Sequence, residues 1–271
     1  QFVNTYLNRD GSRFTDKPGY EKVAFADEFT DRDYRLMQSI RHPGYTRKNN
    51  NVNTHYAPDF GYCVTGYQPI KWVIDDTSLD SNTSPCSTCI PILRYAEVLL
   101  NYAEAKAELG EFSETVWNAT VRLLRERAGV DGKMPDSYDP YMAGYFLNTV
   151  TDMALLEIRR ERGIELLLEN CRWDDDMRWH MGDLLTSDNN PWTGIWIGNT
   201  GYTYDFTGQS TDDNGDPVPD FYIRPGEDTE HSIAISNTGA NQTFSLNAAG
   251  NIVWEYKRTS VSYTHLRAHE T

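Results

Sequence analysis

Two runs of apolar residues at helical spacing, joined by a very short connection, constrain the fold of this chain more than any other feature. Residues 92–109 and 113–128 both repeat apolar side chains in steps of three and four. The apolar positions are Leu93, Ala96, Leu100, Ala103 and Ala107, and then Val116, Ala119, Leu123 and Leu124. Pro91 fits the first turn of the first helix and Ser113 the N-cap of the second. Gly110 and Gly129 fit the positions just past the two ends. Because only about four residues separate the runs, we expect an antiparallel helical hairpin.

The rest of the chain adds two further helices and long irregular stretches. Helical patterns cover residues 148–170, expected to pack on the hairpin, and about 173–185. Residues 68–74 contain β-forming side chains and predict one short strand. Residues 1–60 and 186–250 are rich in polar and turn-forming residues and are expected to be loops. The predicted fold class is therefore mainly α, with helical hairpins, long irregular loops and few short strands.

Charge and ring content narrow the possible functions. The chain has 25 Lys and Arg against 40 Asp and Glu, a formal net charge of −15. A phosphate backbone would be repelled, so we expect no nucleic-acid partner; a neutral ligand, a cation or a protein fits better. Aromatic residues make up 13% of the chain, too many for a disordered protein. No run of about 18 apolar residues is present, so no transmembrane helix is expected.

Carboxylates and arginines alternate along residues 157–179. Glu161 and Glu165 lie about one helical turn apart, as a pair of catalytic carboxylates in a glycoside hydrolase would. The alternative is a structural network in which arginines hold both carboxylates ionised. We favour the structural interpretation and expect the partners among Arg159, Arg160, Arg162, Arg172 and Arg178.

No pattern predicts a metal or a cofactor. Cys86 and Cys89 are spaced as zinc ligands can be, with Cys63 and Cys171 as further candidates, but no second such pair is present. A Cys86–Cys89 disulfide or free thiols are favoured over zinc. Residues 212–216 depart from the calcium-loop pattern and predict a solvated turn. Phosphate-binding glycine loops and nucleophile motifs are absent from the sequence, so no cofactor, no metal and no catalytic residue is expected.

Three motifs in this chain resemble one bacterial family. Residues 158–179 fit I-R-x-E-R-x-x-E-L-x-x-E-x-x-R-x-x-D-x-x-R-W, and residues 91–105 fit P-x-x-R-Y-A-E-V-L-L-x-Y-A-E-A. Residues 29–36 are similar to F-x-x-R-D-x-R-L, followed by Pro43-Gly44. These motifs, in this order, resemble the SusD/RagB family of outer-surface nutrient-binding lipoproteins. The family's closing Tyr-Pro-Ile-Pro motif does not appear in this sequence.

The resemblance implies tetratricopeptide-like helical pairs that carry a ligand site on long loops. It implies a binding protein, not an enzyme, held on the outer membrane by a lipid on a preceding N-terminus. Such a protein captures a glycan and passes it to a partner TonB-dependent transporter of the SusC type. We expect residues 1–258 to be a single C-terminal region of such a protein and residues 259–271 to be a non-native tail. A glycoside hydrolase and a protein-binding helical-repeat scaffold remain the alternatives.

Rings and polar side chains in two loop regions are candidates for the ligand site, because sugar rings stack on aromatic faces. The regions are residues 45–72 and 192–222, and the resemblance favours the first. There we expect Tyr56, Tyr62 and Trp72 to be stacking platforms, with Asn53 and Asp59 binding hydroxyl groups.

Overall fold

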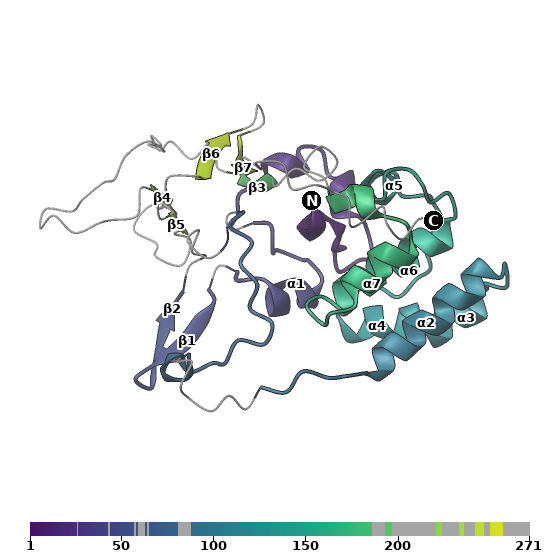
Figure 1. Cartoon of the computed structure of the whole chain (residues 1–271), viewed down its shortest axis with the longest axis horizontal. Coiled ribbons are helices and arrows are strands. Elements are labelled where there is room, and N and C mark those ends of the chain that lie inside the picture. Colours follow the sequence, from purple (N-terminus) through teal and green to yellow (C-terminus); the bar gives the residue numbers. More distant parts are fainter. Residues whose placement is uncertain are drawn as a thin grey trace, which may run out of the picture.

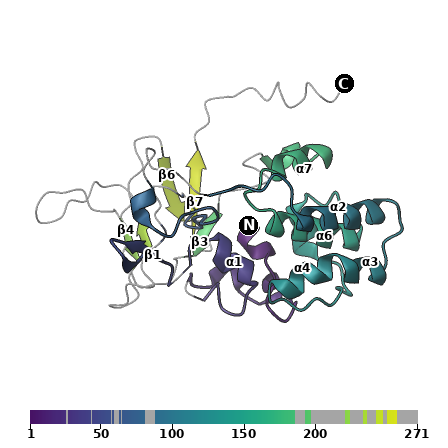
Figure 2. The same ribbon diagram turned by 90° about the horizontal axis from the view of Figure 1, so that it is seen from below.

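The computed structural model describes most of the chain up to residue 185 and short segments beyond it. The described residues are 1–25, 27–42, 44–56, 58, 63, 65–80, 88–185, 193–196, 221–223, 233–235, 242–246 and 250–256. They form a helical part and a part with short strands, which lie on opposite sides of the chain in two perpendicular views (Figures 1 and 2). In this part of the chain no helix is long and apolar enough to cross a membrane.

The helical hairpin is confirmed, with different boundaries. Helix α2 runs from Tyr95 to Glu108, and the second run is two helices, α3 (Glu114–Ala119) and α4 (Val121–Arg127). Thr120 interrupts the second run: its hydroxyl donates to the carbonyl of Val116 at 2.6 Å, and its backbone leaves the helical region. Figure 1 shows α2 and α3 running antiparallel. The predicted Ser113 cap accepts from the Val116 N–H, and Gly110 and Gly129 follow the helix ends with positive φ.

The third predicted helix is shorter than expected and occupies the centre. Helix α6 (Met153–Glu165) begins after Asp152, whose carboxylate accepts from the N–H of Leu155 at 2.9 Å. It packs on α2 and α4, with Ile158 in one apolar cluster and Leu156 in another. The first cluster joins α2, α3, α4 and α6 around Leu100, Trp117 and Val121. Three more α-helices lie in this part: α1 (Tyr34–Ser39), α5 (Pro140–Tyr145) and α7 (Arg172–Arg178). The sequence did not predict α1 or α5, and α1 shows that residues 1–60 are not loop throughout.

Short strands differ most from expectation. Strands β1 (Thr46–Asn49) and β2 (Val52–His55) form an antiparallel hairpin, and their turn residues Asn50 and Asn51 both have positive φ. The predicted strand at 68–74 is wrong, because Trp72 adopts φ 75° and turns the chain; Pro69 makes only an isolated bridge to Ile40. Strands β3 (Thr193–Trp196), β7 (Asn251–Tyr256) and β6 (Gln242–Leu246) pair in that order, and β4 (Phe221–Ile223) pairs with β5 (Ile233–Ile235). Residues 186–250 are thus not loop throughout.

Candidate functional site

The carboxylates of α6 form a buried ion network with arginines from other elements. Glu161 accepts from Arg35 of α1 at 2.6 Å and from Arg125 of α4 at 3.0 Å. Glu165 shares Arg35 at 2.8 Å and also pairs at 2.5 Å with Arg94, the residue before α2. The structural role of both carboxylates is therefore supported, but the expected partners are wrong. Arg159, Arg160 and Arg162 lie only one or two residues from Glu161, and side chains at that spacing on a helix do not face each other.

The arginines that the sequence analysis proposed as partners of Glu161 and Glu165 instead contact side chains of neighbouring elements. Arg162 pairs with Asp175 at 2.6 Å, and Arg178 pairs with Glu104 of α2 at 2.6 Å. Arg159 lies over the ring of Trp179, with 4.5 Å between its Cζ atom and the ring centroid. These contacts join α7 to α2 and α6, so the charged motif acts as a set of cross-links between helices.

The electrostatics of the network oppose a general-acid role for its carboxylates. Burial by itself would raise the pKa of Glu165, but Arg35, Arg94 and Arg127 outweigh it and lower that pKa to about 2. The pKa of Glu157 is likewise about 2, because Arg160 and Arg125 outweigh the effect of burial. A general acid must hold its proton near neutral pH, which requires a raised pKa. Glu157 and Glu165 therefore do not meet this requirement of a general acid.

Two tyrosines and two arginines meet at the base of the β1–β2 hairpin. We call Arg41, Tyr45, Arg47 and Tyr56 the hairpin cluster. The N–H of Tyr56 donates to the carbonyl of Tyr45 at 3.0 Å, which extends the strand ladder by one pair. The Cζ atom of Arg41 lies 5.4 Å from the ring centroid of Tyr45 and 5.9 Å from that of Tyr56. Both rings are partly exposed, so they combine a fixed position with an accessible surface.

Arg47 fixes the orientation of this cluster. Its guanidinium donates to the carbonyl of Ile74 at 2.6 and 3.0 Å and to the carboxylate of Asp80 at 2.6 and 2.8 Å. The Asp80 hydrogen bonds raise the pKa of Arg47, which therefore stays charged. Its Cζ atom lies 5.9 Å from the Tyr56 ring centroid. The Arg47 guanidinium, held by these hydrogen bonds, restricts rotation of the Tyr56 ring without covering both of its faces.

Trp72 is held against the end of α6, separately from the cluster. Its indole N–H donates to the carbonyl of Leu168 at 2.9 Å, and the Nζ atom of Lys71 lies 5.4 Å from its ring centroid. Lys71 in turn pairs with Glu169 at 2.5 Å. The indole is half-buried, and its N–H already has a protein partner. Only part of the indole ring face of Trp72 is therefore available to a ligand.

The remaining predicted ligand residues are distributed differently. Asn53 is exposed on β2, directly opposite Lys48 in the register, and alternation along the strand places it on the other face from Tyr56. One sugar ring stacked on Tyr56 is therefore not expected to reach Asn53. Tyr62 and Asp59 lie outside the described residues, and their expected roles stay predictions.

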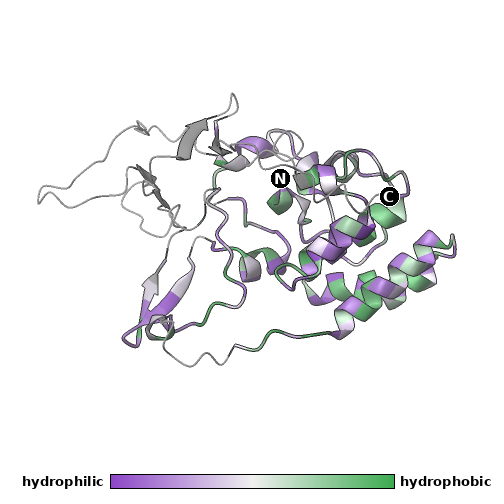
Figure 3. Ribbon diagram, in the orientation of Figure 1, coloured by the Kyte–Doolittle hydropathy of each residue, from purple (hydrophilic) through white to green (hydrophobic). Residues whose placement is uncertain are grey.

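The two candidate loop regions meet at one point. The N–H of Ile195, in β3, donates to the carbonyl of Thr65 at 3.0 Å. Tyr67, close by in sequence, donates its hydroxyl to the buried Glu28 at 2.8 Å. The segment after the hairpin is thus attached both to β3 and to the N-terminal part of the chain. Figure 3 shows that the hairpin itself is hydrophilic, in contrast to the alternating colours of the helices.

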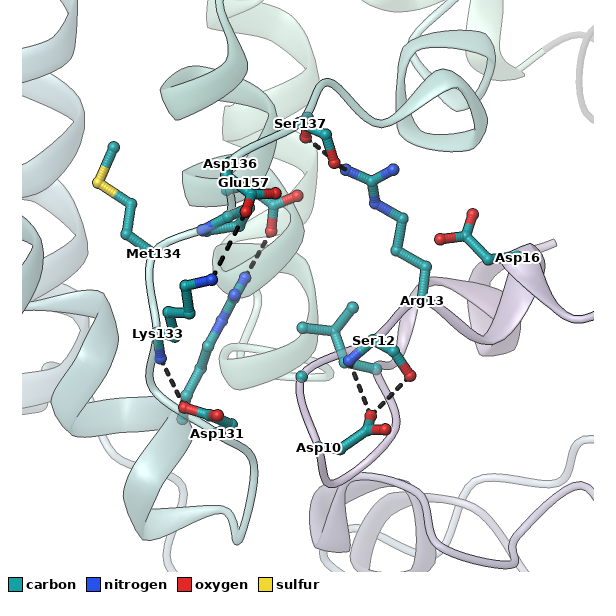
Figure 4. A pocket seen from close by; sticks show the side chains of 14 residues that line it. Asp10, Ser12, Arg13, Asp16, Asp131, Lys133, Met134, Asp136, Ser137 and Glu157 are labelled. Atoms are coloured by element: carbon teal, nitrogen blue, oxygen red, sulfur yellow. Dashed lines mark hydrogen bonds and ion pairs between the residues drawn. The ribbon is translucent and has the colours of Figure 1, made fainter.

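A separate pocket of about 250 Å³ lies between the 9–16 turn and the 131–137 loop (Figure 4). Sequence patterns did not predict it. Arg13 donates to Ser137 across it, and the Arg125–Glu157 pair contributes to its lining. Asp10 accepts from Ser12, and Lys133 pairs with Asp136. Most polar side chains of this pocket form hydrogen bonds or ion pairs with one another. The pocket is therefore interpreted as the place where two turns pack together.

Within the described ranges, no group of three or more His, Cys, Asp or Glu side chains could hold a metal ion. Cys63 and Cys171 are free thiols there. Cys86 and residues 212–216 lie outside the described residues, so the disulfide and the solvated turn stay predictions.

Short antiparallel helical pairs that carry an aromatic cluster on an attached loop define a helical-repeat scaffold with a partly exposed aromatic loop surface. The chain belongs to the SusD family, whose model matches residues 1–232. It is 30% identical over 176 residues to the SusD-like protein P38 of Formosa agariphila, a match that covers 61% of this chain and 29% of that protein. A crystal structure of a SusD-like protein from Bacteroides fragilis superposes with a TM-score of 0.50 at 24% identity, covering 72% of this chain and 38% of that one.

These likenesses confirm the family and the mainly α fold with tetratricopeptide-like helical pairs. The chain spans about a third of the length of the relatives it matches.

Proposed function

We propose that this chain is part of a cell-surface glycan-binding protein, not an enzyme, that delivers its ligand to a TonB-dependent transporter of the SusC type. Family membership supports glycan binding in general, and the fold fits a loop-borne site. We further propose that the protein is attached to the outer membrane by a lipid outside residues 1–271. A neutral glycan suits an acidic protein, because its binding carries no charge repulsion.

The hairpin cluster is the single observation on which the placement of the ligand rests. Tyr45 and Tyr56 present partly exposed rings beside braced guanidinium groups. Burial raises the pKa of Tyr45, so its hydroxyl keeps a proton to donate. Sugar C–H faces stack on such rings, while hydroxyls and guanidinium groups can bind sugar oxygens. Trp72 supplies a further ring face, and Tyr62, Asp59 and Asn53 remain candidates for additional contacts.

The test is calorimetric titration of the chain with neutral oligosaccharides from glucan, xylan and mannan series. Tyr56→Ala should weaken binding roughly 2- to 12-fold through the lost stacking contribution of about 0.5–1.5 kcal/mol, and further through lost contact area. Tyr56→Phe should retain most of the affinity if the ring face is what binds. Tyr138→Ala is a matched control, since Tyr138 is a half-exposed tyrosine in the loop before α5.

Three outcomes would contradict the proposal. Unchanged affinity in Tyr56→Ala, with an intact circular dichroism spectrum, would exclude the cluster as the site. Release of reducing ends from any of the oligosaccharides would favour the glycoside hydrolase. Absence of glycan binding together with capture of a protein partner would favour the helical-repeat scaffold. Co-purification of the full-length protein with its transporter tests the delivery step separately.

A further inference from the structure

A second cavity lies between α6, α7 and the N-terminal 3-10 helix η1 (Phe2–Thr5). Its volume is about 300 Å³, at the lower end of the range of about 300–1,000 Å³ for small-molecule sites, so a molecule of roughly one ring fits it. Its described lining residues all differ from those of the hairpin cluster, so it is separate from the proposed glycan site. Large apolar and aromatic side chains form much of its wall: Phe2, Tyr145, Leu166, Leu167 and Leu184.

One carboxylate oxygen in this cavity lacks a hydrogen-bond donor. Asp176, on α7, is 5% exposed, and its Oδ2 atom accepts from the Nε atom of Arg172 at 3.1 Å. The same Nε atom lies 3.0 Å from Oδ1, but Oδ1 accepts no hydrogen bond from the described residues. Burial raises the pKa of Asp176 although Arg172 opposes it, as expected for a carboxylate whose charge is incompletely compensated. Buried polar atoms without a partner are uncommon in folded proteins, so Oδ1 marks a position for a donor.

Arg172 places hydrogen-bond donors next to that oxygen. In the described part of the chain only its Nε atom donates, so its two terminal nitrogens are available to a ligand. The other carboxylate in the wall, Asp175, is fully used, because Oδ2 accepts from Arg162 and Oδ1 accepts from Arg178. The cavity therefore offers one acceptor and adjacent donors, and the Arg172–Asp176 pair carries no net charge.

These groups specify a neutral ligand with an apolar body and a single hydroxyl. A hydroxyl both donates and accepts, so it can donate to Asp176 and accept from Arg172 at the same time. A charged ligand gains little, because the two side chains already neutralise each other and desolvating a further charge is costly. A sugar would leave several hydroxyls unpaired among leucines, whereas an aromatic ring packs well against the rings of Phe2 and Tyr145.

The backbone at one side of the cavity is strained. Leu168 has φ 59° and Asn170 has φ 64°, and bulky residues seldom adopt positive φ. Leu168 is held there by Trp72, whose indole N–H donates to its carbonyl at 2.9 Å. Strained backbone that its surroundings hold in place is frequent at ligand sites. We propose that the cavity between α6 and α7 binds a phenol or a similar aryl alcohol, with the hydroxyl placed between Asp176 and Arg172.

The test is titration of residues 1–271 with p-cresol, followed by protein NMR. Saturable binding with a Kd of about 0.1–1 mM is expected, a range that a ligand of this size reaches. p-Xylene, in which a methyl group replaces the hydroxyl, should bind at least about tenfold more weakly, because Asp176 Oδ1 and the Arg172 terminal nitrogens would stay unpaired.

Gly163→Ala, on α6, narrows the cavity without disturbing the fold. The added Cβ would lie 3.4 Å from Phe2 and 3.5 Å from Arg172, which are ordinary contact distances, and alanine suits a helix interior better than glycine. We expect p-cresol affinity to fall at least about threefold while the Tm is maintained or rises. Gly144→Ala on α5 is the matched control, because no described atom lies within 4 Å of its added Cβ, and it should leave the affinity unchanged.

Four results would overturn the proposal. They are the absence of saturable p-cresol binding, equal affinities for p-cresol and p-xylene, an unchanged p-cresol affinity in Gly163→Ala, and loss of p-cresol binding in the full-length protein. The last result would show that chain outside residues 1–271 fills the cavity, whereas retained binding there supports the site. The glycan site at the hairpin cluster is tested separately by the oligosaccharide titrations.

Discussion

Glu161 provides the sharpest test of the ion network. Its carboxylate accepts from Arg35 at 2.6 Å and Arg125 at 3.0 Å, and all three side chains are buried. Glu161→Gln keeps the size of the side chain and removes the charge. Removing one member of a buried ion pair costs about 3–5 kcal/mol, because its partner keeps an uncompensated charge. Each arginine here retains another carboxylate, Glu165 for Arg35 and Glu157 for Arg125, so we expect the lower limit, about 3 kcal/mol.

Thermal and urea unfolding followed by circular dichroism measure this loss. For a chain of this size, about 3 kcal/mol corresponds to a Tm decrease of about 6–12 °C. Glu126→Gln is the control, because Glu126 pairs with Arg122 at 2.7 Å on the exposed surface, where solvent screens an ion pair and its loss should change the Tm very little. Equal losses in the two variants would refute the reasoning. An unchanged Tm combined with loss of a measured glycan hydrolysis would instead make Glu161 catalytic.

The buried carboxylates also predict pH dependence with opposite signs. Glu165 has a pKa of about 2 in the folded protein against 4.5 in the unfolded chain. The stability that it contributes is therefore present above about pH 4.5 and lost as the pH falls toward 2. Glu165→Gln should reduce that loss, measured as the midpoint of urea unfolding. Burial raises the pKa of Glu28 to about 7, so stability decreases as the pH rises from 4.5 through 7, and Glu28→Gln should raise the midpoint at pH 8 but not at pH 4. Gly129→Ala should cost clearly more than Gly110→Ala: both have positive φ, but only at Gly129 would the added Cβ lie 2.4 Å from the Tyr34 ring. Equal Tm losses in the two glycine variants would contradict that steric account.

The helices could be predicted because their signals are local. Apolar spacing, the Ser113 cap and the glycines after the helix ends all act within a few residues, and the structure has them where the sequence placed them. Boundaries were less accurate. Pro91 does not begin α2, because Ile92 and Leu93 form a bend and the backbone of Arg94 is extended. The guanidinium of Arg94 binds Glu165 and Glu169. That tertiary contact determines where the helix begins, and nothing in the local sequence encodes it.

The β1–β2 hairpin shows a missed local signal. The sequence analysis expects loops throughout residues 1–60, yet asparagine tolerates the positive φ that a two-residue hairpin turn needs, and Asn50 and Asn51 supply it. The partners of Glu161 and Glu165 could not have been predicted from spacing, because Arg35 is 126 residues from Glu161 in sequence. Of the expected ligand residues, Tyr56 lies in a cluster whose arginines the sequence did not identify.

One carboxylate determines how freely the segment that we propose to bind the ligand can change in sequence and length. Glu165 binds Arg35 through Oε2 at 2.8 Å and Arg94 through Oε1 at 2.5 Å, so both ends of residues 36–93 are fastened to a single side chain. The span between those ends is set by two arginine side chains that meet at one carboxylate, whatever the segment contains. Closing a flexible loop becomes only about 0.6 kcal/mol costlier when its length doubles. New rings or a longer hairpin can therefore be accommodated between these two arginines while α1, α2 and α6 keep their positions.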